Sequence, residues 1–323
     1  KFAYLDIETT GLMGGTGTYA FLVGIGRFED REFHLAQFFM RDPAEEPAQL
    51  LAIEEFLAPC EILVTFNGKS FDVPILVTRY ITQGWKTPLS SVTQIDLLHI
   101  SRRLWRDRLP SRTLGNIEAH ILGARRTEED VPGWMIPELY FDYLRSGDAR
   151  PLKRIFYHNA MDVLALAALL NYISCLLGNP TNIPGVIGTE LFGTARLFED
   201  LGYLDRACQI YMNCLKQDLP EALWLETLQH LSMLKKRTGD FPTAISLWQK
   251  AAAHKQIYAH IELAKYYEHQ TRDYDEAARW TRAALEILNM PGFSTAFRQE
   301  WIQELEHRLT RLKRKLADRA LQA

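Results

Sequence analysis

The sequence predicts an α/β domain followed by an all-helical domain. Strand-like segments are confined to residues 1–66, helical periodicity dominates from Phe71 onward, and a stretch rich in turn-forming residues divides the helical part. At 323 residues the chain also exceeds the usual domain of about 150 residues, so we expect two domains, each with its own core.

Composition is that of an ordinary globular protein, with 47% hydrophobic and 24% charged residues. No uninterrupted apolar run reaches the roughly 18 residues of a membrane span, and no secretory leader is visible, so we expect a cytoplasmic protein without a membrane partner. Because the chain starts at Lys1 within an apolar run, we also expect that an upstream segment has been left out.

Charge and cysteine content narrow the class of protein further. A formal net charge of −3 gives no global attraction to nucleic acid, so such binding would need a local basic face or metal ions. The four cysteines are too few and too irregularly spaced for a disulfide framework or a CxxC zinc site, and we interpret them as reduced, mostly buried thiols.

β-branched and aromatic residues predict strands at residues 2–7, 19–28, 32–39 and 62–66, and helical spacing predicts a helix at 44–57. Residues 71–177 are mostly helical in pattern. The turn-rich stretch from Gly178 to Gly185 ends this part. The predicted organisation is therefore an α/β domain at 1–178, a linker at 179–185 and a helical domain at 186–323.

The helical domain contains an internal repeat. Gly239-Asp-Phe-Pro-Thr-Ala and Arg272-Asp-Tyr-Asp-Glu-Ala lie 33 residues apart, and a fainter copy begins at Gly202. The period and the turn followed by Ala resemble tetratricopeptide repeats, in about three units. A basic final helix, residues 294–321, resembles a solvating cap; the alternative is an arm that binds nucleic acid or a protein.

Two carboxylates stand at the end of the first predicted strand, in Asp6-Ile-Glu8-Thr9-Thr10-Gly11. Residues two apart in a strand share one face of the sheet. Neighbouring carboxylates repel each other unless a cation lies between them, and Mg²⁺ or Mn²⁺ prefers such oxygen ligands. An isolated pair of this kind would more often be two exposed charges at a strand edge.

Two further elements carry candidate residues. Asp72, in Asn67-Gly-Lys-Ser-Phe-Asp72, falls in the first turn of a helix that begins around Ser70, where a carboxylate also suits the helix dipole. His158 and Asp162 are spaced i, i+4 near the start of a long apolar helix, and so share one helix face. Each element alone would be unremarkable.

Together, in this order, the three elements resemble the exonuclease motifs of the DEDD (DnaQ-like) superfamily, which has a ribonuclease H-like fold. The resemblance covers residues 1 to about 177. The segments Gln94-Ile-Asp96 to Trp105 and Val131-Pro-Gly-Trp-Met-Ile-Pro137 are similar to the YprB-like subgroup. Asp96 itself could be a further acidic group near the metals, or a helix cap.

The resemblance implies a 3′→5′ exonuclease that cleaves phosphodiester bonds in DNA or RNA. Asp6, Glu8, Asp72 and Asp162 would hold two Mg²⁺ or Mn²⁺ ions, and His158 would position or deprotonate the attacking water. The sequence departs from the family here, because the family's His lies five residues and its Tyr four residues before the last Asp. Tyr157 and His158 are exchanged, so Tyr157 is the alternative to His158.

The resemblance also implies how a single-stranded 3′ end would be bound. Thr9, Thr10 and Gly11 would hold the terminal nucleotide by backbone amides, Leu12 would wedge against its base, and Asn67 would lie near the scissile phosphate. Five arginines between residues 102 and 112, with Trp105 among them, offer cations and a stacking surface, or else an exposed helix face with Trp105 in the core. From this cluster we expect substrate contacts from Arg102, Arg103 and Arg106.

Two other functions stay open. The chain could be a nucleic-acid-binding module that has lost catalytic turnover, which the exchanged Tyr and His motivate. It could also be a scaffold that brings a nuclease to a protein partner through its helical repeats. The sequence does not choose between ribose and deoxyribose, because one or two contacts to a 2′-hydroxyl decide that preference.

Overall fold

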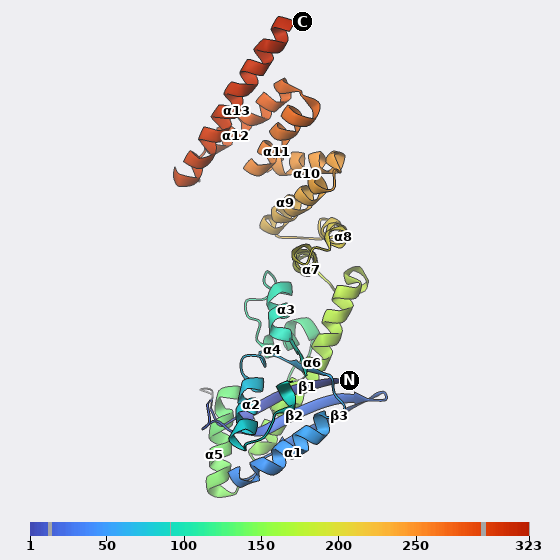
Figure 1. Ribbon diagram of the computed structural model, residues 1–323, viewed down its shortest axis with the longest axis vertical. Coiled ribbons are helices and arrows are strands. Elements are labelled where there is room, and N and C mark those ends of the chain that lie inside the picture. Colours follow the sequence, from blue (N-terminus) through green and yellow to red (C-terminus); the bar gives the residue numbers. More distant parts are fainter. Residues whose placement is uncertain (12–14, 91, 292–294, 323) are drawn as a thin grey trace. The chain divides into compact units, whose positions relative to one another are not determined.

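The computed structural model describes residues 1–11, 15–90, 92–291 and 295–322 (Figure 1). The chain divides into two compact units, Lys1–Pro184 and Gly185–Ala323. The division falls inside the predicted linker at 179–185. The first unit combines a sheet with helices and the second is built of helices, which confirms the predicted fold class.

A five-stranded mixed sheet of order β3-β2-β1-β4-β5 forms the centre of the first unit. Its strands are β1 Phe2–Thr9, β2 Ala20–Glu29, β3 Glu32–Phe39, β4 Ile62–Thr65 and β5 Thr93–Asp96. The first three pair antiparallel, whereas β1, β4 and β5 run parallel. The first four strands confirm the prediction. β5 was missed because its four residues include only one large apolar side chain, within a region of helical pattern.

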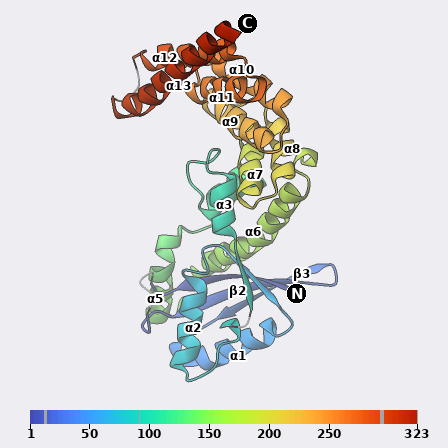
Figure 2. The ribbon, with the colours of Figure 1, turned by 45° about the horizontal axis from the view of Figure 1, so that its top comes forward.

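Six α-helices accompany the sheet in the described part of this unit: α1 Glu46–Leu57, α2 Asp72–Thr82, α3 Leu97–Leu104, α4 Leu114–Ile117, α5 Ile136–Ser146 and α6 Leu152–Gly178. Alternate residues of β1, namely Ala3, Leu5 and Ile7, pack in one core with α1 and α2. Side chains of α5 and α6 form another core with β2. Figure 2 shows α1 and α6 on opposite sides of the sheet.

Helix α6 is long and apolar enough to cross a membrane by length and composition. The sequence shows no uninterrupted apolar run of such length here, because Asn171 and Ser174 interrupt it. In the structure α6 packs on β1, β2 and β3. Two glycines of β2 allow this close approach, since a Cβ at Gly24 would overlap Asn159 and one at Gly26 would overlap Val163. A core helix of a globular unit passes the same test of composition.

The second unit contains α7 Gly188–Asp200, α8 Leu204–Cys214, α9 Glu221–Arg237, α10 Phe241–Ala253, α11 Ile257–Tyr266, α12 Tyr274–Leu288 and α13 Thr295–Gln322. α7 packs with α8, α9 with α10 and α11 with α12. The turns before α8, α10 and α12 each place one residue at positive φ: Gly202, Gly239 and Arg272. The repeat seen in the sequence is therefore a repeat of backbone conformation.

The small residues of the repeat are buried where the helices pack. Ala207, Ala244 and Ala277 are fully buried at equivalent positions of α8, α10 and α12. A larger side chain at these positions would push the paired helices apart. The alanine signature thus has a direct steric reason.

Helix α13 is more than a solvating cap. The Glu268 side chain, which is fully buried, accepts hydrogen bonds from Arg308 at 2.9 Å, Arg311 at 2.8 Å and Lys315 at 2.9 Å. Burial by itself would raise the pKa of Glu268, but the hydrogen bonds from Arg311 and Lys315 outweigh it and lower this pKa to about 2. Three of the basic residues of α13 therefore hold the helix to its own unit.

A glycine exchange at the repeated turn tests its backbone conformation. Gly239→Ala should lower the free energy of unfolding by about 1 kcal/mol, because φ is +78° and an added Cβ meets no atom within 4 Å, so only backbone strain changes. Arg272→Gly should raise it by a similar amount. Urea unfolding followed by circular dichroism measures both, and equal signs for the two variants would contradict the interpretation.

Candidate active site

Asp6 and Glu8 project from β1 toward the face of the sheet that carries α6. Ala3, Leu5 and Ile7 pack in the core on the opposite face, and successive strand residues alternate between faces. A register shift in the pairing of β1 with β2 follows directly between Glu8 and Thr9. Strand β1 thus places two carboxylates on one face, and its register with β2 shifts immediately after them.

Asn159 of α6 fixes the side chain of Asp6. Asp6, Gly24 and Gln37 are direct neighbours across β1, β2 and β3, and the Asn159 side chain lies over Gly24. Gln37 Nε2 donates to Asn159 Oδ1 at 3.0 Å and to the Phe156 carbonyl at 2.8 Å. Asn159 Nδ2 must then face Asp6, and it donates to Asp6 Oδ2 at 3.0 Å. Asn159 is fully buried, so these bonds hold one orientation of the amide.

The structure brings the four predicted acidic residues together. Asp72 is the first residue of α2, and Asp162 lies on α6 one turn after His158. Ligand atoms of Glu8, His158 and Asp162 all lie within 4.8 Å of one another. The charges of Asp162, Glu8 and Asp72 all raise the pKa of Asp6, which places the four carboxyls in one electrostatic cluster.

Burial raises the pKa of every carboxyl in this cluster, and repulsion by other members of the cluster adds to the rise for Asp6, Glu8 and Asp72. Burial is the largest cause for Asp6, Glu8, Asp72 and Asp162 alike. The pKa of Asp72 rises to about 7. For Asp162, the charges of Arg126 and His158 oppose the rise without cancelling it. Four buried carboxyls in one cluster are therefore short of positive charge.

Glu8 supplies a direct test of whether a metal ion suits this cluster. Its Oε1 atom is buried and has no hydrogen-bond partner among the residues that the structure describes. Leaving a buried carboxylate oxygen unsatisfied is costly, whereas a divalent cation bound by oxygen ligands would satisfy it. The carboxylate set, its raised pKa values and this orphaned oxygen fit a site for hard divalent ions.

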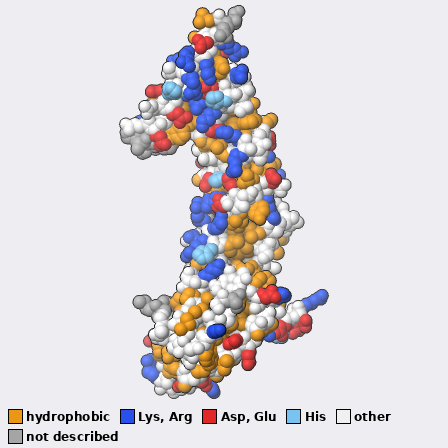
Figure 3. All heavy atoms as spheres, in the orientation of Figure 1, with side chains coloured by type: hydrophobic (Ala, Val, Ile, Leu, Met, Phe, Trp, Pro, Cys, Tyr) orange, Lys and Arg blue, Asp and Glu red, His pale blue; other side chains and the backbone are white. Residues whose placement is uncertain are grey.

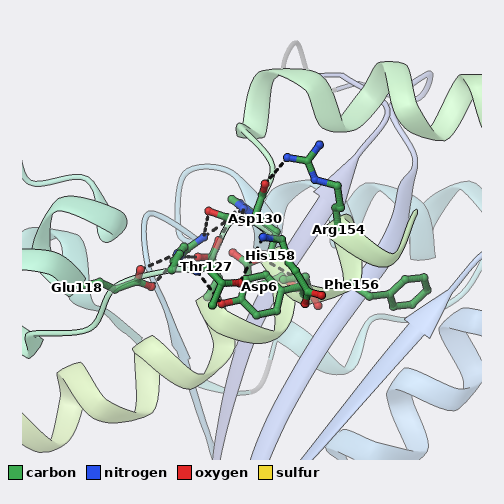
Figure 4. Close-up of polar contacts among 12 residues, drawn as sticks. Asp6, Glu118, Thr127, Asp130, Arg154, Phe156 and His158 are labelled. Atoms are coloured by element: carbon green, nitrogen blue, oxygen red, sulfur yellow. Dashed lines mark hydrogen bonds and ion pairs between the residues drawn. The ribbon is translucent and has the colours of Figure 1, made fainter. Parts of the chain in front are cut away.

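His158 lies against two residues from the segment that precedes α5. Its Nδ1 lies 2.7 Å from Asp130 Oδ1 and 3.1 Å from Arg126 Nη1, and its Nε2 lies 3.4 Å from Asp162 Oδ2. Figure 4 shows the Asp130 and His158 side chains side by side. A proton on Nδ1 would be donated to Asp130, which leaves Nε2 as the acceptor on the side of the carboxylates.

Arg126 supplies the positive charge that this face of the cluster contains. Its guanidinium pairs with both carboxylate oxygens of Glu118, at 2.7 and 2.6 Å, and hydrogen-bonds to Asp162. The Glu118 side chain lies in the short π-helix Glu118–Leu122 and is buried. Glu118 thus holds Arg126 against Asp162.

Helix α6 points the side chains of Tyr157 and His158, the two candidates for the base, in different directions. The helix begins at Leu152 and is unbroken at Tyr157 and His158, so its start is not distorted. Adjacent residues of a helix do not share a face. The Tyr157 hydroxyl accepts a hydrogen bond from the Thr127 amide at 3.2 Å. His158 is the one that faces Asp162.

The residues at the end of β1 and after it, for which we predicted nucleotide contacts, make hydrogen bonds within the chain. The Thr10 amide donates to the Tyr19 carbonyl at 3.0 Å, so it is not available for a ligand, and the Thr9 hydroxyl donates to the Gly11 carbonyl at 2.8 Å. The Thr10 amide is thus already paired with the backbone just before β2. Leu12 lies outside the described residues.

Asn67, Arg102, Arg103 and Arg106 all have exposed side chains. Trp105, by contrast, is fully buried beside Tyr172, so the possible stacking surface is a core residue. Asp96 caps α3 and accepts from the Asn67, Lys69 and Leu98 amides. Its charge also raises the pKa of Asp72, so the cap lies within electrostatic reach of the cluster.

Sequence reasoning missed Arg126, Glu118, Asp130 and Gln37, and it gave Asn159 no role. The first three lie in or beside the charged stretch Ala124-Arg-Arg-Thr-Glu-Glu-Asp130, which has no periodic pattern. Gln37 is one polar residue in an alternating strand. No spacing in the sequence marks these contacts, because they form between segments that are up to 153 residues apart.

Comparisons with known proteins give a family, a relative and a solved structure to which the chain is similar. A family model described as RNase_H superfamily matches residues 3–174. "Uncharacterized protein YprB" of Bacillus subtilis (strain 168) is 31% identical over 319 residues, covering 97% of this chain and 74% of that protein. The family B DNA polymerase from the archaeon Pyrobaculum calidifontis is 17% identical with a TM-score of 0.42; the match covers 64% of this chain and 29% of the polymerase. The family match includes all four clustered carboxylates.

A double-mutant cycle tests the contact over Gly24. Gly24→Ala should cost about 1–3 kcal/mol of unfolding free energy, because the new Cβ would lie 2.1 Å from Asn159 Oδ1. In an Asn159→Ala background, where that oxygen is gone, the same substitution should cost less than about 1 kcal/mol. Urea unfolding of the four proteins measures the coupling, and strictly additive costs would contradict the contact.

The cluster also predicts how stability depends on pH. The folded-state pKa of Asp72 is raised from 3.8 to about 7, so between these values the folded protein binds a proton that the unfolded chain has lost. In EDTA the free energy of unfolding should therefore fall as pH rises from about 4 to 7, by up to about 1.4 kcal/mol per pH unit for each such proton.

Asp72→Asn should flatten this fall, and Mn²⁺ should oppose it in the unmodified protein, because a bound cation stabilises the ionised carboxylates. A stability that stays level or rises from pH 4 to 7 in EDTA would show that the carboxyls are not crowded as described.

Proposed function

Because the chain belongs to the RNase_H superfamily, we propose that it is a metal-dependent 3′→5′ exonuclease that hydrolyses phosphodiester bonds in DNA or RNA. One observation carries the proposal: Asp6, Glu8, Asp72 and Asp162, from three separate parts of the chain, form a single buried carboxylate cluster beside His158. An ion-free cluster of this kind is electrostatically unfavourable, so a purely structural role would not explain it.

The four carboxylates would hold two Mg²⁺ or Mn²⁺ ions. When bound, such ions polarise the phosphate and lower the pKa of a bound water. Asn159 keeps the Asp6 carboxylate in the orientation a ligand needs, since it bonds Oδ2 and is itself held by Gln37. Arg126 offsets part of the negative charge through Asp162.

His158 would accept the proton of the attacking water through Nε2. Asp130, 2.7 Å from Nδ1, would hold the ring in the required tautomer and orientation. The Arg126 guanidinium lies beside the same ring nitrogen and is anchored by Glu118. The proton-accepting group is therefore positioned by side chains that are themselves fixed.

Substrate binding would rely on local positive charge, because the whole chain is acidic. On the face shown in Figure 3, Lys and Arg side chains gather over α3 and the loop that follows it. We assign Asn67, Arg102, Arg103 and Arg106 to the binding of a single-stranded 3′ end. The second unit, with its tetratricopeptide-like helix pairs, would bind a protein partner.

Labelled oligonucleotides test the proposal. The protein should shorten 5′-labelled single strands from the 3′ end in Mn²⁺ or Mg²⁺ and do nothing in EDTA. Asp6→Asn, Glu8→Gln, Asp72→Asn and Asp162→Asn should each lower kcat at least about a hundredfold, because each removes a ligand charge without a change of size.

The matched control for these substitutions is Asp142→Asn, which removes an exposed carboxylate of α5 that pairs only with Arg145 in the described structure. It should leave the rate unchanged. Absence of metal-dependent shortening on every DNA and RNA substrate, from a folded protein, would refute the exonuclease assignment and favour a binding module without turnover.

A further inference from the structure

A pocket of about 520 Å³ is lined in part by Phe66 and Asn67, at the start of the loop that leads to Asp72. Its walls come from the end of β4, from α3 and from the segment between α3 and α4. The lining residues are Phe66, Asn67, Leu98, Arg102, Pro110, Ser111, Arg112, Thr113 and Leu114. Its volume falls within the roughly 300–1,000 Å³ of small-ligand sites.

The lining divides into a cationic part and an apolar part. Arg102 and Arg112 contribute two guanidinium groups, and no acidic side chain is among the described residues that line the pocket. Arg102 is exposed, and the described residues offer it no ion-pair partner. Phe66, Leu98, Pro110 and Leu114 provide apolar surface. A ligand with an anionic group and a flat apolar face matches both parts.

The pocket is preformed by hydrogen bonds within its own walls. Arg112 Nη1 donates to the Leu109 carbonyl at 2.9 Å, which orients the guanidinium and leaves its other N–H groups available. Asn116 Nδ2 donates to the Ser111 carbonyl at 2.5 Å. A ligand therefore meets a loop that has already lost much of its conformational freedom.

One side chain joins this pocket to the carboxylate cluster. The Asp96 carboxylate accepts from the amides of Asn67 at 2.8 Å, Lys69 at 3.2 Å and Leu98 at 3.0 Å. It thereby ties the loop before Asp72 to the start of α3, and Asn67 adopts a left-handed backbone conformation there, with φ of +65°. The pocket and the cluster share this loop as a common wall.

We propose that this pocket binds one unpaired nucleotide of the substrate strand, upstream of the nucleotide that is removed, with its phosphate at Arg102 and Arg112 and its base on the apolar wall. The inference rests on the proposed exonuclease function, and it adds a second binding position on the same strand. A base held on the apolar wall cannot be paired with a complementary strand, so the pocket selects single-stranded nucleic acid.

Two substrates of different length separate this inference from the proposed function. Thymidine 5′-monophosphate p-nitrophenyl ester has only the phosphate that is cleaved, so it offers no second phosphate to Arg102 and Arg112, whereas a single strand of about ten nucleotides does. Arg102→Ala and Arg112→Ala should each raise KM about tenfold more for the oligonucleotide than for the ester. The dependence of log kcat/KM on log salt concentration should become shallower by about 0.7 for the oligonucleotide.

Two variants complete the experiment. Arg31→Ala removes an exposed cation in the turn between β2 and β3 and should change neither substrate, which controls for net charge. Ser111→Asp places a negative charge at an exposed position of the pocket wall and should weaken oligonucleotide binding as the arginine variants do. It also tests the pocket if an arginine variant does not fold.

The outcomes remain distinguishable. Equal effects of the arginine variants on both substrates, or no effect on either, would overturn the pocket assignment while leaving the exonuclease intact. If the unmodified protein hydrolyses neither substrate, the exonuclease proposal fails, and fluorescence anisotropy with the same oligonucleotide still decides the pocket. Unchanged affinity in Arg102→Ala, Arg112→Ala and Ser111→Asp would then reject it.

Discussion

The contact between Asn159 and the bare backbone at Gly24 is the constraint on which the carboxylate cluster depends. Because Gly24 lacks a side chain, α6 lies close enough to the sheet for Asn159 to bond Asp6 and Gln37 on either side. The same approach brings His158 and Asp162 of the same helix to Glu8. Together with Gly26, which lets Val163 approach, the missing Cβ of Gly24 thus sets the distance between two elements that carry the carboxylates.

That close approach creates an electrostatic problem. Four carboxyls are buried together, and the positive charge near them comes from Arg126, which Glu118 holds in place. Repulsion between the carboxylates lowers the free energy of unfolding. Hydrophobic packing on both faces of the sheet offsets this loss. Sites that oppose stability in this way are typical of function, because selection for packing alone would remove them.

In the second unit, too, small residues allow close packing, here between paired helices. Its helix pairs repeat one turn conformation and one buried alanine, so each pair packs closely without a sheet. Glu268 then fastens the last helix by three cationic side chains, in a position where a lone buried carboxylate would be very costly. Three of the basic side chains expected to face solvent on the C-terminal helix therefore bond Glu268 within the unit.

Sequence alone determined the parts of this protein that depend on local pattern. The alternation around Asp6 and Glu8, the i, i+4 spacing of His158 and Asp162, and the turn-plus-alanine repeat each follow from strand or helix periodicity, which neighbouring residues fix. Only the tertiary structure decided that Arg126, Asp130 and Gln37 take part, that Trp105 is core, and that a pocket adjoins the cluster. These depend on which segments meet, and contacts between residues far apart in sequence, from 28 positions for Asp130 and His158 to 122 for Gln37 and Asn159, leave no periodic trace in one sequence.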